Sequence, residues 1–197
     1  MIKTDIILAG VGGQGILSIA AILGAAALNE NLFLKQAETH GMSQRGGEVV
    51  SHLRISGSPI YSDLIPLGGA DLILAVEPLE SLRYLPYLKK NGSLVTNLTE
   101  FRNIGNYPEL EKTFSELGAK LKVVKIDADQ MARETGNPKA SNMVMLGAAS
   151  PFINITGEII LKAIETVFGP KGSDVVESSR QAFLAGKHFA EEYLGTT

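Results

Sequence analysis

The segment that most restricts the fold is a short apolar run followed by closely spaced glycines near the N-terminus. Residues 6–9 are all apolar and lead into Gly10-Val-Gly-Gly-Gln-Gly15. An uninterrupted apolar run of this length is typical of a strand buried on both faces of a parallel sheet. Ala, Leu and Ile dominate residues 16–28, which predicts a buried helix. The chain is therefore predicted to open with a Rossmann-type strand, glycine turn and helix.

The rest of the chain continues to alternate apolar runs with helical patterns. Because Ser56-Gly-Ser58 separates two runs with strand character, we expect a β-hairpin and a mixed sheet. The fold predicted is a three-layer α/β fold with a Rossmann-like mixed sheet and C-terminal helices, in a single domain over residues 1–197. Strands are expected at 32–36, 49–55, 59–64, 71–76, 93–97 and 120–126, and helices at 79–88, 109–117, 139–149, 157–168 and 173–193.

Composition excludes several classes of function. The chain has 197 residues and a net charge of -3, and its basic residues form no cluster, which argues against a nucleic-acid or membrane-surface partner. It contains no cysteine, so thiolate nucleophiles, disulfides and cysteine-bound iron-sulfur clusters are absent from this polypeptide. The N-terminal residues lack a signal-peptide pattern, and we expect a cytoplasmic protein.

The glycine loop has the spacing of a dinucleotide-binding turn. Gly10 is expected to form the tight turn, Gly12 to let the backbone approach a pyrophosphate or a neighbouring segment, and Gly15 to let helix pack on strand. Gly13 and the amide of Gln14 complete the loop, beside the helix N-terminus, as a site for an anion or a close-packed partner. A dinucleotide site also needs an acid after the second strand, and Glu38 fits this requirement poorly. Nucleotide binding and close packing both remain open.

A second polar segment stands out at residues 38–47, Glu-Thr-His-Gly-Met-Ser-Gln-Arg-Gly-Gly. It has no hydrophobic periodicity, and we expect a loop at the carboxyl edge of the sheet, where α/β proteins place ligand contacts. Arg45 lies among glycines and can bind phosphate or carboxylate oxygens in pairs. A hydrogen-bonded surface loop without a ligand is the alternative.

Three motifs in order resemble the gamma-type domain of 2-oxoacid:ferredoxin oxidoreductases. They are the GVGGQG loop, ETHGMSQRGG with the following EVVSHLRI, and Asn142-Met-Val-Met-Leu-Gly147. The resemblance spans nearly the whole chain, and the form of the second motif is most similar to the small beta subunit of indolepyruvate ferredoxin oxidoreductase. It implies oxidative decarboxylation of a 2-oxoacid, such as indolepyruvate or another aryl pyruvate, with coenzyme A as cosubstrate.

The resemblance also implies that the cofactors are bound by a different subunit. Thiamine diphosphate, Mg and the iron-sulfur clusters are expected on a large catalytic subunit, ferredoxin accepts the electrons, and this chain binds no cofactor of its own. No catalytic residue and no metal ligand are assigned to it. Our hypothesis is that His40, Gln44 and Arg45, with the glycines Gly46 and Gly47, face the catalytic subunit or the phosphates of coenzyme A.

Two other functions remain open. An NAD(P)- or flavin-dependent reductase would use the glycine loop directly, and a non-enzymatic nucleotide-binding module would bind a partner without affecting turnover. His52 and His188 are interpreted as structural because neither has metal-ligating neighbours in the sequence. Glu77, at the end of a predicted strand, fits either a ligand contact or a helix cap.

Overall fold

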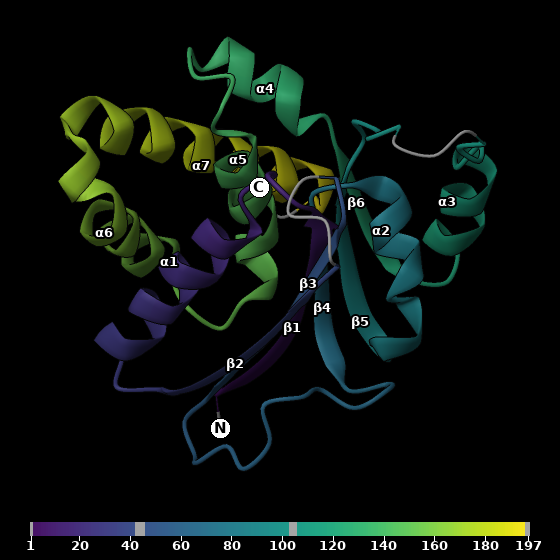
Figure 1. Cartoon of the computed structure of the whole chain (residues 1–197), viewed down its shortest axis with the longest axis horizontal. Helices are drawn as coiled ribbons and strands as arrows, with labels where there is room; N and C mark the ends of the chain where they lie inside the picture. Colours follow the sequence, from purple (N-terminus) through teal and green to yellow (C-terminus); the bar gives the residue numbers. More distant parts are fainter. Residues whose placement is uncertain (1, 42–45, 103–105, 196–197) are drawn as a thin grey trace.

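The structure, a computed structural model, describes residues 2–41, 46–102 and 106–195. One six-stranded sheet runs through it with helices on both faces, in the order β2-β3-β1-β4-β5-β6 (Figure 1). The strands are β1 (Lys3–Val11), β2 (Phe33–His40), β3 (Glu48–Ser56), β4 (Ala70–Ala75), β5 (Leu88–Asn97) and β6 (Lys122–Ile126). The α-helices are α1 (Ile16–Asn29), α2 (Pro78–Arg83), α3 (Glu111–Gly118), α4 (Ala128–Glu134), α5 (Ser141–Ala149), α6 (Gly157–Phe168) and α7 (Ser173–Tyr193).

The sheet is mixed, as predicted, but the hairpin lies elsewhere than expected. β3 pairs antiparallel with both β1 and β2, while β1, β4, β5 and β6 run parallel. The predicted strand at residues 59–64 is wrong, because this segment forms no strand. Both edges of β3 are already occupied by β1 and β2, so no edge remains for a third partner. Residues 57–69 instead cross the end of the sheet as a loop, at the bottom of Figure 1.

Two apolar clusters make the three layers. On one face, β1 and the parallel strands pack against α1 and α5, with α6 and α7 packed outside them. On the other face, α2 and α3 cover β1, β4, β5 and β6. Alternate side chains of β1 pack on opposite faces of the sheet. Ile6 and Leu8 belong to the first cluster, and Ile7 and Ala9 belong to the second. This alternation explains why the strand is apolar without interruption.

Most helices lie where they were expected, with two differences. α6 and α7 have the predicted bounds, whereas the predicted helix at 79–88 ends as α2 at Arg83 and continues only as a 3-10 turn. α4 was not predicted. Its signal was Asp127, whose side chain caps the helix by accepting a hydrogen bond from the Gln130 N–H at 2.9 Å. Among the described residues, no helix is long and apolar enough to span a membrane.

Candidate functional site

The glycine turn between β1 and α1 is tighter than predicted. β1 continues through Gly10 to Val11, so Gly10 is not the turn residue, contrary to prediction. A Cβ at Gly10 would lie 2.3 Å from the Val76 Cγ2 atom, which makes this glycine necessary for packing against the end of β4. Gly13 and Gly15 form the turn, with φ of 101° and 81°, in the left-handed region that favours glycine.

Side-chain and backbone hydrogen bonds fix the turn. The Gln14 Oε1 atom accepts the Val11 N–H at 2.8 Å, and the Gln14 N–H donates to the Val11 carbonyl at 3.1 Å. The amide oxygen of Gln14 thus closes the turn instead of facing a ligand. Gly12 donates its N–H to the Gly47 carbonyl at 2.8 Å, which joins the turn directly to the second polar segment. The predicted close approach at Gly12 is therefore to another segment of this chain.

Helix α5 contacts the glycine turn through the side chain of Asn142. Asn142 donates from Nδ2 to the Gly15 carbonyl at 3.2 Å, across 127 residues of sequence. A Cβ at Gly15 would lie 2.4 Å from the same Nδ2 atom, so only glycine leaves room for this contact. Gly15 was expected to bring helix and strand together, but the close neighbour is α5. The Asn142-to-Gly147 motif is thus tied to the glycine loop in space.

The start of the second polar segment is strand, not loop. β2 runs to His40 and pairs with β3, so Glu38 and His40 project from the last residues of an edge strand. Strand β2 thus takes residues 38–40 of the segment predicted as a loop. Directly after the strand, the Gly41 N–H donates to the Glu48 carbonyl at 3.0 Å. Gln44 and Arg45 lie outside the described residues. Gly46 has a φ of 77°.

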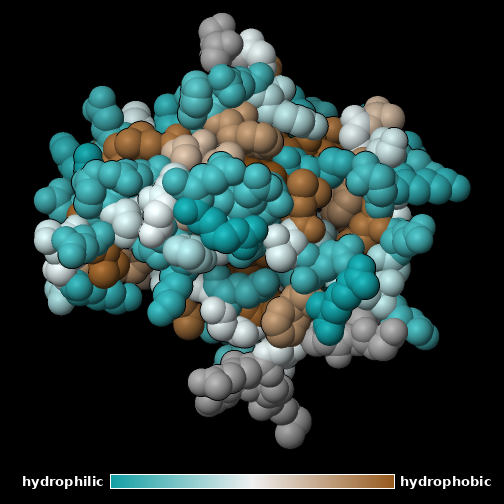
Figure 2. Space-filling view, turned by 90° about the horizontal axis from the view of Figure 1, so that it is seen from above, coloured by the Kyte–Doolittle hydropathy of each residue, from teal (hydrophilic) through white to brown (hydrophobic). Residues whose placement is uncertain are grey.

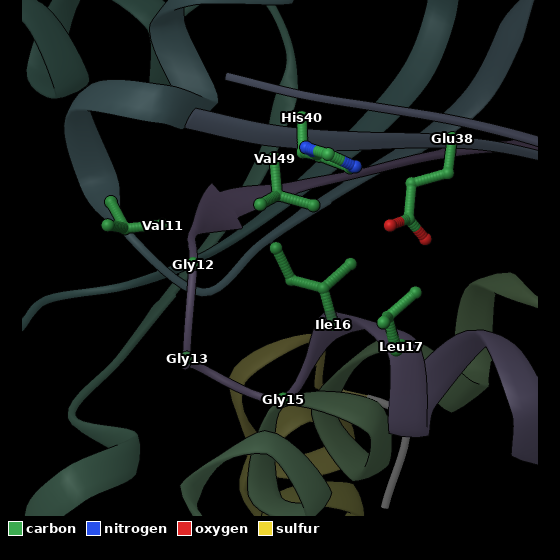
Figure 3. A pocket seen from close by; sticks show the side chains of 9 residues that line it. All are labelled: Val11, Gly12, Gly13, Gly15, Ile16, Leu17, Glu38, His40 and Val49. Carbon is green, nitrogen blue, oxygen red and sulfur yellow. The ribbon is translucent and has the colours of Figure 1, made fainter. Parts of the chain in front are cut away.

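A pocket of about 230 Å³ lies where these two segments meet. Figure 3 shows Glu38 and His40 on one side, with Ile16 and Leu17 of α1 opposite them. The pocket is lined by Val11, Gly12, Gly13, Gly15, Ile16, Leu17, Glu38, His40 and Val49. The structure therefore brings together the glycine turn and His40, which were predicted as site residues, and adds Glu38.

The arrangement of strands differs from a dinucleotide-binding fold. In that fold the acid after the second strand lies next to the glycine turn because the first two strands are neighbours. Here β3 lies between β1 and β2 and runs antiparallel to both. Glu38 still reaches the pocket, which the sequence did not indicate, because strand adjacency was unknown. This topology does not favour the alternative of a nucleotide-dependent reductase.

Glu77, left open by the sequence, is a buried helix cap. Its carboxylate accepts hydrogen bonds from the Glu80 N–H at 2.8 Å, the Phe101 N–H at 3.2 Å and the Tyr107 hydroxyl at 2.6 Å. Burial, together with this hydrogen bond to Glu77, raises the pKa of Tyr107 well above its usual value, so the phenol stays protonated. The Glu77 carboxylate is fully used within the fold and is a structural group.

A buried amide at the same edge of the sheet was not predicted. Asn97, at the end of β5, accepts the Leu98 and Ala128 N–H groups at 2.9 and 3.0 Å. Its Nδ2 atom donates to Asp129 Oδ2 at 2.8 Å and to the Val76 carbonyl at 3.3 Å. The side chain of Asn97 thereby joins β4, β5 and α4, and both its oxygen and its nitrogen take part in these hydrogen bonds.

The remaining histidines have local structural roles. His52 is buried, and its Nδ1 atom accepts the Ile65 N–H at 3.1 Å, which fixes loop 57–69 against the sheet. Burial and the nearby Arg54 charge lower the pKa of His52, keeping the ring neutral. His188 forms an exposed contact with Glu192 on α7 at 3.2 Å. Within the described ranges, no group of three or more His, Asp or Glu side chains has metal-binding geometry.

Comparisons with known proteins agree on one family. The family described as "Pyruvate ferredoxin/flavodoxin oxidoreductase" matches residues 5–189. Two curated relatives named "Indolepyruvate oxidoreductase subunit IorB", from Thermococcus kodakarensis and Pyrococcus horikoshii, are each 38% identical to this chain. The first match covers 99% of this chain and 100% of the relative, and the second covers 98% and 99%.

Solved structures share the fold. The 2-oxoglutarate:ferredoxin oxidoreductase from Magnetococcus marinus, solved with 2-oxoglutarate, coenzyme A and succinyl-CoA bound, has a TM-score of 0.79 at 24% identity. That match covers 98% of this chain but 32% of the other chain. The gamma subunit of keto/oxoacid ferredoxin oxidoreductase from Geobacter sulfurreducens has a TM-score of 0.68 at 23% identity, covering 96% and 99%. The resemblance in the sequence motifs is confirmed, and this chain belongs to the pyruvate ferredoxin/flavodoxin oxidoreductase family as a gamma-type subunit of a 2-oxoacid:ferredoxin oxidoreductase.

Proposed function

We propose that this chain is the cofactor-free small subunit of an oxidoreductase that converts indolepyruvate or another aryl pyruvate to an acyl-CoA and reduces ferredoxin. The curated relatives named for indolepyruvate, 38% identical along their full length, support the substrate class. The absence of cysteine supports placing the iron-sulfur clusters on a large partner subunit, together with thiamine diphosphate and Mg. When bound there, thiamine diphosphate would supply the carbon chemistry.

The observation that carries the proposal is the junction of the two polar segments. The Gly12-to-Gly47 hydrogen bond and the shared pocket bring the two polar segments together at the carboxyl edge of the sheet. In α/β proteins this edge is where ligands bind. The lining residues of the pocket include no Ser, Thr or Lys and no cluster of metal ligands, which fits a subunit that binds and positions a cosubstrate while another subunit performs the chemistry.

Co-purification tests the proposal. The chain, tagged in its native host, should retain a large subunit that contains thiamine diphosphate and iron-sulfur clusters. The purified complex should reduce ferredoxin with indolepyruvate and coenzyme A, while this chain alone should not. Indolepyruvate turnover by the chain alone, or a complex that reduces ferredoxin equally without coenzyme A, would contradict the proposal.

Arg45 is expected to contribute to coenzyme A binding in that complex. Phosphate oxygens accept paired hydrogen bonds from a guanidinium, and losing one charged contact costs about 1.5–3 kcal/mol. Arg45→Ala should therefore raise the KM for coenzyme A about tenfold or more in steady-state assays. Arg102→Ala, which removes an arginine paired with Glu100 on the surface, serves as the control and should leave this KM unchanged. Unchanged KM and unchanged subunit association in Arg45→Ala would refute this role.

Loop 57–69 is our proposed docking surface for the large subunit. Tyr61, Leu64 and Leu67 are 94%, 58% and 69% exposed, although the loop is fixed by Arg54, which donates to the Ser62 and Leu64 carbonyls. Large apolar side chains held at the surface are typical of protein interfaces. The opposite face, seen from above in Figure 2, is hydrophilic over much of its area, with hydrophobic residues between the hydrophilic ones.

Exposed residues of this loop are expected to control assembly. In the Magnetococcus structure, the match covers 32% of the chain, so about two thirds of that chain lies outside the shared fold. Tyr61→Ser with Leu67→Ser should weaken association with the large subunit by about tenfold or more. Titration calorimetry of the two subunits measures this. Leu184→Ser, on the exposed side of α7, is the control, and equal affinities for the two variants would rule out the loop.

A further inference from the structure

Strand β6 is an edge strand of the sheet, and its outer side has no strand partner among the described residues. The Leu98 N–H donates to the Ile126 carbonyl at 2.9 Å, so the backbone of Ile126 faces β5. Backbone N–H and C=O groups of successive strand residues point to alternate sides. The groups of Val124 therefore also face β5, and those of Val123 and Lys125 face outward. Within the described ranges, these outward groups have no hydrogen-bond partner.

A surface groove runs along this unpaired edge. Its first part, of about 490 Å³, contains Val123 and is otherwise mostly apolar. Its apolar side chains come from both faces of the sheet, and they are Leu121, Pro151, Phe152, Tyr193 and Leu194. The second part, of about 450 Å³, lies at the start of β5 and β6. Both parts share Leu121 and Lys122, so the groove is continuous.

The second part of the groove is basic. Lys90, Lys120 and Lys122 line it, and no Asp or Glu lines either part. These three lysines have no ion pair within the part of the chain that the structure describes, whereas the neighbouring Lys89 and Lys125 each pair with an acid. The whole chain has a net charge of -3, so this positive charge is a local feature. Unpaired positive charge of this kind favours an acidic partner.

Lysines on an edge strand often serve to prevent pairing with another chain. That role would explain Lys122, but it would not explain an apolar groove beside the same edge. An unpaired edge next to such a groove is instead the arrangement that binds an extended peptide. The peptide backbone pairs with the edge, and alternate side chains of the peptide enter the groove.

We propose that an extended acidic segment of the large subunit adds to β6 as a further strand. Its acidic side chains would lie beside Lys90, Lys120 and Lys122, and a large apolar side chain would fill the apolar part of the groove. This inference rests on the proposed function, because it takes the large subunit as the partner. It adds a second contact surface and the chemistry of the segment that binds there.

The position of the groove supports the large subunit as the source of this segment. Because β4, β5 and β6 run parallel, the start of the groove lies at the end of the sheet where loop 57–69 leads into β4. The Gly68 N–H of this loop donates to the Pro86 carbonyl at 2.9 Å, just before β5. A partner docked on loop 57–69 therefore has direct access to the groove.

Charge reversal tests the basic part of the groove. Lys120→Glu with Lys122→Glu changes two exposed side chains and should weaken association with the large subunit about tenfold in titration calorimetry, because like charges would then face each other. Added salt should weaken binding of the wild type more than binding of this variant. Lys162→Glu with Lys171→Glu is the matched control and should leave the affinity unchanged. These two lysines lie on α6 and the turn after it, on the opposite side of the molecule from α3 (Figure 1).

Hydrogen exchange of the wild-type chain tests the added strand without any substitution. A strand bonded to β6 should slow amide exchange at Val123 and Lys125 when the complex forms, because their N–H groups gain acceptors. The Val124 amide faces β5 and should exchange slowly both in the separate chain and in the complex. Exchange resolved to single amides measures this difference.

Two results would overturn the inference and leave the proposed function intact. One is equal affinity of the two double variants for the large subunit. The other is unchanged exchange at Val123 and Lys125 in the complex, since the edge would then remain unpaired. Slower exchange at these amides only after ferredoxin is added would also overturn it, because a different protein would occupy the edge. A wild-type chain that retains no large subunit would refute the proposed function itself.

Discussion

Replacing Gly147 by alanine is expected to destabilise the fold strongly. Gly147 lies on α5, where a Cβ would be 2.0 Å from the Phe183 carbonyl oxygen and 2.8 Å from the Lys187 N atom of α7. Gly186 on α7 faces α5 in the same way, with its Cβ position 2.0 Å from the Val144 carbonyl oxygen. Both obstacles are backbone atoms, so no side-chain rotation relieves them. The two helices touch backbone to backbone and would have to separate.

The size of the effect follows from what this contact supports. α5 is almost completely buried between the sheet and α7, so moving the helices apart disturbs the main apolar cluster. Overpacking of a core costs about 1–3 kcal/mol even when side chains can adjust. We expect at least about 3 kcal/mol here, a large part of the roughly 5–15 kcal/mol that stabilises a typical domain. Asn142, on the same helix, would no longer support the glycine turn.

Chemical denaturation of the purified chain measures this loss. Gly118→Ala is the matched control, because Gly118 ends α3 and a Cβ there meets no atom within 4 Å. It should leave stability unchanged or slightly increased, since alanine has the higher helix propensity. A Gly147→Ala variant as stable as Gly118→Ala would show that α5 and α7 do not pack this closely.

Arg54→Ala is expected to destabilise the chain by about 3 kcal/mol, because it removes the two-bond partner of a buried carboxylate and leaves only the more exposed Lys3, at 3.2 Å. Arg54 donates from Nε to Asp5 Oδ1 at 2.8 Å and from Nη2 to Asp5 Oδ2 at 3.2 Å, which joins β3 to β1. The Asp5 side chain is only 2% exposed. Loop 57–69 loses two hydrogen bonds in the same variant, at Ser62 and Leu64.

The pH dependence of stability identifies the ion pair as the cause. Burial alone would raise the pKa of Asp5, but hydrogen bonds and charges from Arg54 and Lys3 outweigh it and lower this pKa below 3.8. In the wild type, Asp5 therefore stabilises the fold above pH 3.8, and this contribution is lost as pH falls through the lower folded pKa. Without Arg54, only Lys3 opposes the effect of burial. The folded-state pKa of Asp5 is then higher than in the wild type, so the variant loses less stability than the wild type as the pH falls. The stability difference between wild type and Arg54→Ala should therefore shrink on acidification.

Urea titrations at neutral pH and near pH 4 provide the measurement. Arg180→Ala is the control, since Arg180 forms only an exposed pair with Glu177 at 3.8 Å, and surface pairs contribute about 0–1 kcal/mol. A difference between wild type and Arg54→Ala that stays constant with pH would mean that Asp5 is not the group left unpaired.

Local patterns were sufficient where neighbours in sequence are also neighbours in space. The apolar run before Gly10 predicted a buried strand, and the bounds of α6 and α7 follow from helical periodicity ended by turn residues. Predictions were wrong where the conformation of a segment depends on pairing with a distant segment. The turn signal at Ser56-Gly-Ser58 was read as a hairpin because the sequence does not show that β1 and β2 already occupy both edges of β3.

In the candidate site, too, local sequence patterns were sufficient for some residues, while others depend on contacts between distant segments. The sequence identified the glycine loop and His40 as polar or unusual segments, but assigned Gly10 to the turn and left Glu38 in a loop. Only the folded chain brings Val76 against Gly10, Asn142 against Gly15 and Glu38 to the pocket.

The sequence by itself determined the fold class, the glycine turn and the family, because each depends on short runs of residues whose local conformation is nearly fixed. Tertiary structure decided which glycines are needed for packing, where the hairpin forms and which side chains meet at the pocket. These depend on contacts between residues far apart in the chain, such as Asn142 and Gly15, and local propensity carries no information about such contacts.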